Sequence, residues 1–138
     1  TDRRSAEEKI RDLSRAIVQS PASVLITDLD GRIEYVNPKF ESLTGYSLDE
    51  VRGLNPRVLQ SGRTDPRVYD ELWSTILSGQ TWEGELENKK KDGSFYHERA
   101  SISPVRDEDG QIRHFVAVKE DITEQRKLQA QLLQAQKM

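Results

Sequence analysis

The 138-residue sequence contains no cysteine and only two histidines. The missing cysteine excludes disulfides, thiolate metal sites, thiol nucleophiles and any covalent bond between a cysteine and a cofactor. Two isolated histidines do not make a metal site either. No apolar run approaches the roughly 18 residues of a membrane span, and the start of the chain lacks the apolar core of a signal peptide. We therefore expect a cytoplasmic fragment without direct membrane contact.

The sequence also lacks a strong excess of either charge. Lysine and arginine number 21 against 24 aspartate and glutamate residues, for a net charge of -3. Such a balance creates no field that would collect nucleic acid, so we expect no nucleic-acid partner. Paired carboxylates beside a nucleophile and glycine-rich phosphate loops are missing too, and we read no catalytic activity in this chain.

Hydrophobic spacing, capping residues and turn signals divide the chain into alternating blocks. The predicted order is a helix, two strands, short helices and one longer helix, three strands and a final helix. The expected elements are helix 5–20, strands 23–28 and 32–37, short helices beginning at Asn37 and Ser47, helix 65–79, strands 81–88, 94–105 and 111–122, and helix 123–138.

The last three strands alternate between two faces. Trp82, Leu86 and Asn88 share one face of their strand, whereas the glutamates between them share the other. By the same period of two, Glu98 falls on the apolar face of the next strand. A polar side chain buried there without a partner would cost about 1–3 kcal/mol. We therefore expect a polar group to meet Asn88.

These blocks predict an α+β fold: a five-stranded antiparallel sheet with short helices across one face and amphipathic helices at both ends. We divide the chain into an N-terminal amphipathic helix (1–19), a core domain (20–122) and a C-terminal coiled-coil helix (123–138). Leu128, Leu132 and Ala135 form the seam of that last helix, which has no stop signal and which we expect to be truncated.

The order and spacing of several motifs resemble the PAS sensor domains. The matching pieces are "ITDLDGRIEYVNPKFESLTGYSLDEVRG", "KKDGSFYHERASISPVRDEDGQIRHFVAV" and the triplet "DIT" at residues 121–123. Within that family the stretch "NPRVLQ", residues 55–60, is most similar to the flavin-binding branch, which includes the light-oxygen-voltage domains and the flavin redox sensors that regulate nitrogen fixation. Pro56 stands where light-oxygen-voltage domains carry their photoactive cysteine, so the cysteinyl-flavin photoadduct cannot form.

The resemblance implies a flavin site, with FAD as our choice and FMN or no cofactor as alternatives. Asn55, Arg57 and Gln60 match the flavin-binding pattern, and Asn88 matches an asparagine that binds the isoalloxazine edge. Glu98 and Lys119 stand where the photoreceptors have a second asparagine and their signalling glutamine. The full set of candidate cofactor-binding residues is Asn55, Arg57, Gln60, Trp73, Trp82, Asn88, Glu98 and Lys119.

Each candidate also has a purely structural interpretation. Glu98 and Lys119 can form an internal ion pair, and Asn55 and Asn88 can cap a helix or a turn. Trp73 and Trp82 can be core residues, and the strand histidines His97 and His114 ordinary residues of the outer face. These interpretations remain open at the level of the sequence.

The function that the resemblance implies is sensory. We expect a flavin-binding module that relays redox or oxygen state through its final helix to a downstream kinase domain, most simply in a sensor histidine kinase of a two-component system. Flanking helices and an outer sheet face that carries Phe95, Val116 and Val118 favour a homodimer. A cofactor-free dimerisation and relay module is the main alternative, and a pocket for a small organic metabolite is another.

Overall fold

The computed structural model describes residue 12 and residues 15–137. Residues 15–19 are helical, and the rest of the predicted N-terminal helix lies outside the described residues except for residue 12. The elements that follow are β1 (Ser23–Thr27), β2 (Ile33–Val36), α2 (Pro38–Thr44), α3 (Leu48–Val51), the 3₁₀ helix η1 (Pro56–Leu59), α4 (Pro66–Leu77), β3 (Trp82–Lys89), β4 (Phe95–Arg106), β5 (Ile112–Asp121) and α5 (Thr123–Gln136).

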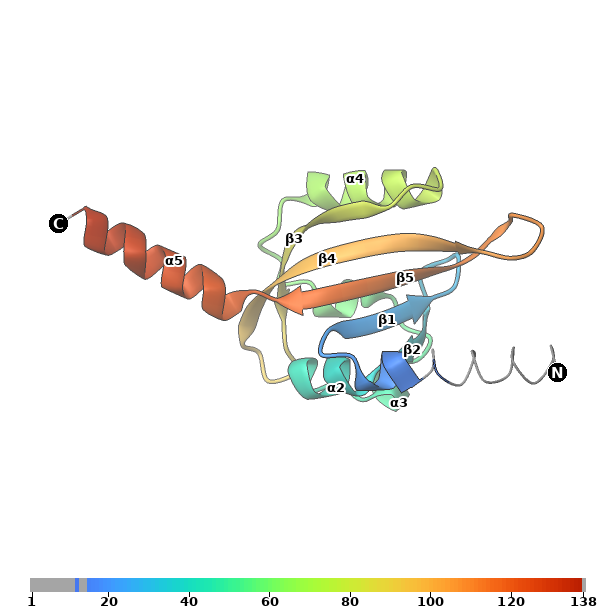
Figure 1. The fold of residues 1–138 in the computed structure, drawn as a ribbon, viewed down its shortest axis with the longest axis horizontal. Coiled ribbons are helices and arrows are strands. Elements are labelled where there is room, and N and C mark those ends of the chain that lie inside the picture. The colour runs from blue at the N-terminus through green and yellow to red at the C-terminus, as the bar shows by residue number, and fades with distance from the viewer. Residues whose placement is uncertain (1–11, 13–14, 138) are drawn as a thin grey trace.

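The strands form one five-stranded antiparallel sheet in the order β2-β1-β5-β4-β3. The helices between β2 and β3 pack against one face of the sheet, and the opposite face is not covered by them (Figure 1). This arrangement confirms the predicted α+β fold with short helices across one face of the sheet.

Two apolar clusters fill the space between helices and sheet. One joins α2, α3 and η1 to β1, β2 and β5, and includes Phe40, Val51 and Leu59. The other joins α4 to β3, β4 and β5, with Leu72 and Ile76 packed on the sheet. Each cluster has its own set of helices, so two separate groups of helices cover different parts of the inner face of the sheet. A space can remain between the two groups.

Local signals in the sequence explain where these helices begin. Asn37 caps α2 and Asp65 caps α4, in each case just before a proline in the first turn. Ser47 and Glu50 form a reciprocal capping box on α3. These predicted helix starts are confirmed.

The predicted alternation of β3 and β4 is also confirmed. Trp82, Leu86 and Asn88 are buried on β3, while Glu83 and Glu85 are exposed. On β4 the buried residues are Tyr96, Glu98 and Ala100. The strand register places Leu86 opposite Glu98 and Asn88 opposite Tyr96. The polar pair Asn88 and Glu98 therefore lies side by side on the inner face.

The exit helix α5 leaves the sheet at the end of β5 and projects from the domain (Figure 1). Thr123, predicted as its cap, is instead its first residue, and the Asp121 carboxylate accepts the hydrogen bond from the Thr123 amide at 3.0 Å. None of its described residues is buried, and Leu128 and Leu132 are exposed.

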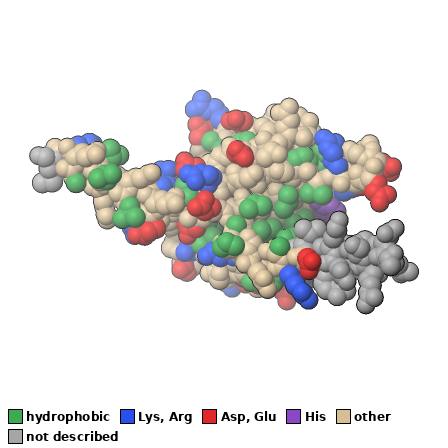
Figure 2. Space-filling model, in the orientation of Figure 1, with side chains coloured by type: hydrophobic (Ala, Val, Ile, Leu, Met, Phe, Trp, Pro, Cys, Tyr) green, Lys and Arg blue, Asp and Glu red, His purple; other side chains and the backbone are tan. Residues whose placement is uncertain are grey.

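Hydrophobic side chains gather on the outer face of the sheet and recur along α5 (Figure 2). Val118 and Val105 are exposed there, while Phe115 and Ala117 on the same strand as Val118 are buried in the core. Both faces of β5 are thus apolar, as predicted. Among the described residues, no helix has the length and apolarity that crossing a bilayer requires.

The fully buried Asn37 ties three segments together. Its side-chain oxygen accepts hydrogen bonds from the amides of Val24 and Phe40 at 2.9 and 3.1 Å. Its amide group donates to the carbonyls of Ala22 and Ile17 at 2.9 and 3.1 Å. One amide side chain therefore joins the N-terminal helical segment, β1 and α2.

We predict that Asn37→Ala lowers the free energy of unfolding by about 2 kcal/mol or more, because it leaves several buried backbone groups unpaired. Urea unfolding monitored by circular dichroism measures this change. Ser42→Ala, in the exposed part of α2, is the control and should change stability by less than about 0.5 kcal/mol. Equal effects of the two substitutions would contradict the structural role of Asn37.

Candidate functional site

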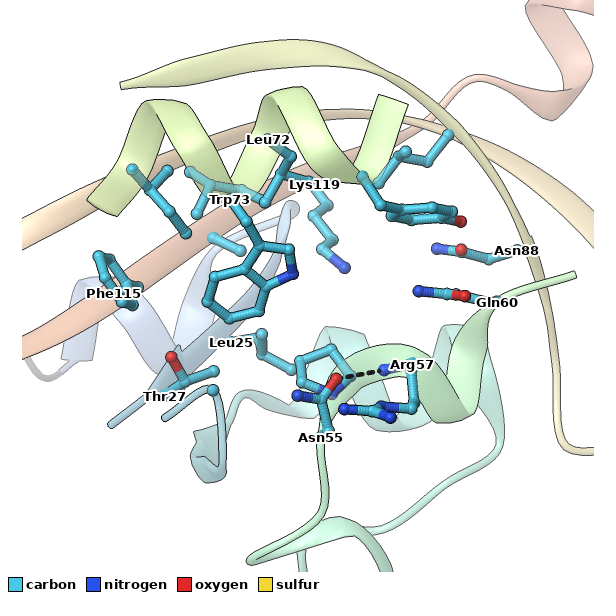
Figure 3. Close-up of a pocket in the computed structure, with 17 residues that line it drawn as sticks. Leu25, Thr27, Asn55, Arg57, Gln60, Leu72, Trp73, Asn88, Phe115 and Lys119 are labelled. Atoms are coloured by element: carbon cyan, nitrogen blue, oxygen red, sulfur yellow. Dashed lines mark hydrogen bonds between the residues drawn. The ribbon is translucent and has the colours of Figure 1, made fainter. Parts of the chain in front are cut away.

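A pocket opens between the two apolar clusters, over the inner face of the sheet (Figure 3). Its cavity volume, counted as the space open to the centre of a water molecule, is about 80 Å³. Apolar side chains from the sheet and from α4 form its walls, and amide and charged side chains lie at its margins. The lining residues are Leu25, Thr27, Gly31, Asn55, Pro56, Arg57, Gln60, Tyr69, Leu72, Trp73, Ile76, Leu86, Asn88, Ile102, Phe115, Ala117 and Lys119.

The structure brings six of the eight predicted cofactor-binding residues to this pocket. They are Asn55, Arg57, Gln60, Trp73, Asn88 and Lys119. Trp82 does not line it and belongs to the core cluster beneath α4. Glu98 does not line it either, but its carboxylate contacts Asn88 and Lys119, which do. The role of each residue toward a ligand stays a prediction.

The segment that contains η1 forms one side of the pocket. Asn55 accepts a hydrogen bond from the Arg57 amide at 2.9 Å and so starts the 3₁₀ helix, with Pro56 in its first turn. Gln60 ends the helix and pairs with Asn88 of β3 in an isolated antiparallel bridge. This bridge fixes the segment against the edge of the sheet, where Asn55, Pro56, Arg57 and Gln60 line the pocket and Leu59 packs in the core.

Trp73 projects from α4 into the pocket (Figure 3). Its ring meets Phe115 edge-on, with 6.2 Å between centroids and an angle of 89°. On its other side it lies so close to Gly31 that a Cβ atom at that position would come within 2.7 Å of the ring. Trp73 therefore bridges α4 and the β1–β2 turn, and the glycine makes room for it.

A buried polar cluster closes the inner end of the pocket. The exposed fractions of Glu98, Asn88 and Lys119 are 1%, 3% and 6%. Glu98 Oε1 accepts a hydrogen bond from Asn88 Nδ2 at 2.5 Å and lies 3.1 Å from Lys119 Nζ. The carboxylate and the ammonium neutralise each other, so neither charge is buried alone.

Two tyrosines stand beside this cluster. Burial, reinforced by the Glu98 carboxylate, raises the pKa of the Tyr96 phenol. Burial also raises the pKa of Tyr69, which lines the pocket. The neighbouring Thr64 side chain opposes this rise in the pKa of Tyr69, but among the described residues no hydrogen bond of acceptable geometry reaches the buried Tyr69 Oη atom. An unsatisfied hydroxyl at a pocket wall is a position where a polar group of a ligand would be stabilised.

Sequence reasoning missed Tyr69 and most of the apolar walls. Tyr69 was recognisable only as one member of the apolar face of helix 65–79, which does not distinguish a pocket wall from the core. The part of the chain described here holds no group of three or more histidine, aspartate or glutamate side chains placed to bind a metal ion. The site therefore offers an apolar space with amide, hydroxyl and ammonium groups at its edges.

The family to which the chain belongs follows from comparison with known proteins. The profile of the PAS domain matches residues 21–124, which include the whole sheet and all the helices around the pocket. The chain is a PAS domain. PAS domains are sensory modules of signalling proteins, so the pocket lies in a sensory module.

Two curated relatives illustrate the range of proteins that carry similar PAS domains. The nitrogen fixation regulatory protein of Klebsiella oxytoca is 37% identical over 107 residues, covering 78% of this chain and 22% of that protein. The blue-light-activated histidine kinase of Brucella anthropi is 35% identical over 122 residues, covering 86% of this chain and 25% of that protein. This PAS domain thus spans about a quarter of the length of these relatives.

Solved structures with light-oxygen-voltage domains have the same fold. An RNA-binding light-oxygen-voltage receptor superposes with a TM-score of 0.80 at 32% identity, covering 91% of this chain and 36% of that one. The light-oxygen-voltage domain of the Erythrobacter litoralis blue-light-activated histidine kinase gives 0.71 at 32% identity, covering 76% of this chain and 99% of that one. The predicted resemblance to the light-oxygen-voltage-like branch of the PAS family is confirmed.

We predict that Lys119→Met destabilises the PAS domain by about 3 kcal/mol, because it leaves the Glu98 carboxylate buried without its cation. Adding Glu98→Gln in the same chain should restore most of this loss, since a neutral amide can still accept the hydrogen bond from Asn88. Chemical unfolding of the wild type, the single variant and the double variant measures both effects. A double variant as unstable as Lys119→Met would show that the two side chains do not act as a buried pair.

Proposed function

We propose that this PAS domain binds a flavin in the pocket and relays its redox state, or the presence of oxygen, through α5 to a kinase domain. The observation that carries the proposal is the composition of the pocket. A space between apolar and aromatic walls, with polar groups at its margins, suits a ligand that has an aromatic body and a hydrogen-bonding edge. The isoalloxazine ring of a flavin has this character.

The polar residues divide into two groups by position. Lys119, Asn88 and Gln60 lie together at the inner end (Figure 3) and would meet the polar edge of the ring. Asn55 and Arg57 also line an adjoining hollow beside Asp30, which Gln60 shares, and they would meet the side chain of the nucleotide. The buried Tyr69 hydroxyl is available to a third polar group.

The inner end also suits a redox sensor. Reduction of a bound flavin changes its protonation and charge. Lys119 faces the pocket, and Glu98 lies behind it, so a new negative charge would attract the ammonium and compete with the carboxylate. If Lys119 moved from Glu98 to the reduced flavin, a change in the charge of the ligand would become a change in the contacts between β4 and β5.

The known relatives agree with this proposal. A solved light-oxygen-voltage domain with a flavin analogue superposes at a TM-score of 0.76 with 27% identity, covering 92% of this chain and 96% of that one. Similarity to a histidine kinase supports a kinase as the downstream partner. FAD and a redox signal are our choice within the flavin-binding branch, and the titration below compares FAD with FMN. The photoreceptor adduct is excluded, because residue 56 is proline and the sequence has no thiol.

A second function has specific support. Asn88, Glu98 and Lys119 satisfy one another, and Trp73 occupies part of the pocket. With its buried polar groups paired and its pocket partly filled by a side chain, a PAS domain of this kind can fold, dimerise and relay a signal without a cofactor. The two functions differ in whether flavin binds, which a titration decides.

We predict that the purified PAS domain binds flavin and that Arg57→Ala weakens its affinity about tenfold, because one charge-assisted contact is lost. Quenching of flavin fluorescence on titration with FAD, and separately with FMN, measures the affinity and identifies the preferred nucleotide. Arg67→Ala is the matched control, since Arg67 is an exposed arginine outside the pocket lining, paired with Asp65.

A spectrum recorded before and after dithionite completes the test. A flavin spectrum that bleaches and recovers on reoxidation supports the redox sensor. Protein that is colourless, and that binds neither nucleotide, favours the cofactor-free relay. Equal losses of affinity in Arg57→Ala and Arg67→Ala would contradict the assignment of Arg57.

We also propose that the parent protein dimerises through a parallel coiled coil that begins in α5. Because the chain has no cysteine, single cysteines can be introduced without background. Leu132→Cys, on the seam, should form a disulfide-linked dimer under mild oxidation, whereas the equally exposed Leu133→Cys should link much more slowly. Nonreducing gel electrophoresis measures both. Equal rates at the two positions would contradict the seam.

A further inference from the structure

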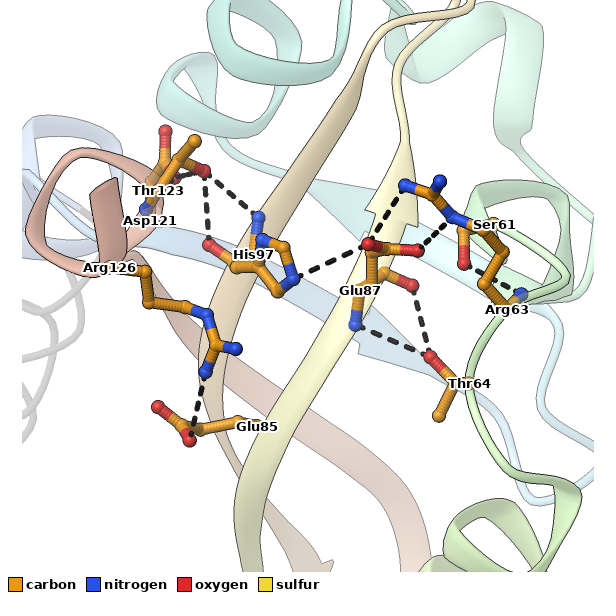
Figure 4. A network of polar contacts seen from close by, with 9 residues as sticks. All are labelled: Ser61, Arg63, Thr64, Glu85, Glu87, His97, Asp121, Thr123 and Arg126. Carbon is orange, nitrogen blue, oxygen red and sulfur yellow. Dashed lines mark hydrogen bonds and ion pairs between the residues drawn. The ribbon is translucent and has the colours of Figure 1, made fainter. Parts of the chain in front are cut away.

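A network of polar contacts lies on the outer side of the sheet, opposite the buried cluster (Figure 4). It connects the loop after η1 to β3, then to β4, and then to the first residues of α5. None of its residues belongs to the pocket lining.

The network begins where the pocket segment meets β3. Arg63 donates two hydrogen bonds to the Glu87 carboxylate, at 2.7 and 3.0 Å. Its guanidinium also stacks 3.7 Å above the centre of the Phe95 ring. Thr64 Oγ1 donates to the Glu87 carbonyl at 3.3 Å and accepts from the Glu87 amide at 3.4 Å. The Arg63 guanidinium holds the pKa of Glu87 below its usual value. The loop is therefore attached to one residue by several contacts.

From Glu87 the network crosses to β4. Glu87 and His97 are opposite each other in the strand register, and Glu87 Oε2 lies 3.4 Å from His97 Nε2. The side chain of Glu87 thus contacts Arg63 on one side and His97 on the other, as Figure 4 shows.

The backbone of His97 in turn holds the start of the exit helix. The His97 amide donates to Thr123 Oγ1 at 2.9 Å, and the His97 carbonyl accepts from the Ile122 amide at 2.9 Å. One turn later, Arg126 of α5 lies 3.7 Å from Glu85 of β3. The first turn of α5 is therefore anchored to the two strands that carry the network.

The same strands present the pocket cluster on their inner face. Successive residues of a strand point to opposite sides, so Asn88 faces the pocket where Glu87 faces outward, and Glu98 faces inward where His97 faces outward. Gln60, which lines the pocket, is bridged to Asn88 and lies three residues from Arg63. A displacement of the pocket segment must therefore move Glu87 or break its contacts.

We propose that Glu87 and His97 are positioning residues that couple the pocket segment, residues 55–64, to the start of α5. The pair has two available arrangements: Glu87 held by Arg63 and His97 together, or released from Arg63 when the loop moves. In the first arrangement the beginning of α5 is fixed to β4, and in the second it is loosened. This route runs through β3 and β4, and it is separate from the Lys119 position on β5.

The test uses the amide of Ile122, which is hydrogen-bonded to His97 and far from Arg63 in sequence. Hydrogen exchange is measured by NMR in the wild type, Arg63→Gln, His97→Ala and the double variant. We expect Arg63→Gln to speed exchange of the Ile122 amide about two- to fivefold. This is the change in the local opening equilibrium that the loss of one well-formed ion pair produces. In the His97→Ala background the same substitution should have no further effect.

Two controls separate coupling from general loss of stability. Rates at Ile122 are compared with those of the central sheet amides of Leu25 and Ala117, which a global destabilisation would speed equally. Asp107→Asn removes the Arg113–Asp107 pair, whose Nε–Oδ2 distance of 2.7 Å matches that of Arg63 and Glu87, and it should leave Ile122 unchanged. An unchanged Ile122 rate in Arg63→Gln, or an equal effect in both His97 backgrounds, would overturn the proposal.

Discussion

A carboxylate cannot remain charged inside a protein unless other groups replace its water, and this constraint shapes the inner end of the pocket. Glu98 is almost fully buried, and it is satisfied by an amide from β3 and an ammonium from β5. The three central inward-facing polar residues thereby lock three adjacent strands together. Lys119, the cation that pairs with Glu98, also lines the pocket. The need to neutralise the buried carboxylate therefore places a positive charge where a ligand would bind.

The pocket exists because the core is divided. Had α4 packed against the same apolar cluster as α2 and η1, the inner face of the sheet would have closed completely. Instead each group of helices covers its own part of the sheet, and Trp73 reaches across the gap toward Gly31. A pocket between two separately packed clusters can widen without unfolding either cluster, which is a useful property in a sensory domain.

Much of this arrangement could be predicted from the sequence, and the limits have physical causes. Caps such as Asn37 and the period-two alternation around Asn88 depend on a few neighbouring residues, so they specified the helices, the strands and their buried faces. The pairing of Asn88 with Glu98 needed the strand register as well. The exclusion of Trp82 from the pocket lining could not be predicted, because alternation assigns a residue to a face and not to a position along it. The link from Arg63 through Glu87 to His97 depends on the path of a loop, which no local pattern encodes.

The alternation of the strands also explains how one small sheet can serve both a pocket and an exit helix. A sheet is one residue thick, so neighbouring residues such as Glu98 and His97 contact different surroundings while sharing one peptide bond. A change in the hydrogen bonds of one alters the backbone of the other. Because the Ile122 amide and the Thr123 hydroxyl bind that backbone directly, α5 is attached at a point where both faces of the sheet act on it. The coupling that we propose between the pocket and the exit helix therefore requires no large movement of the sheet.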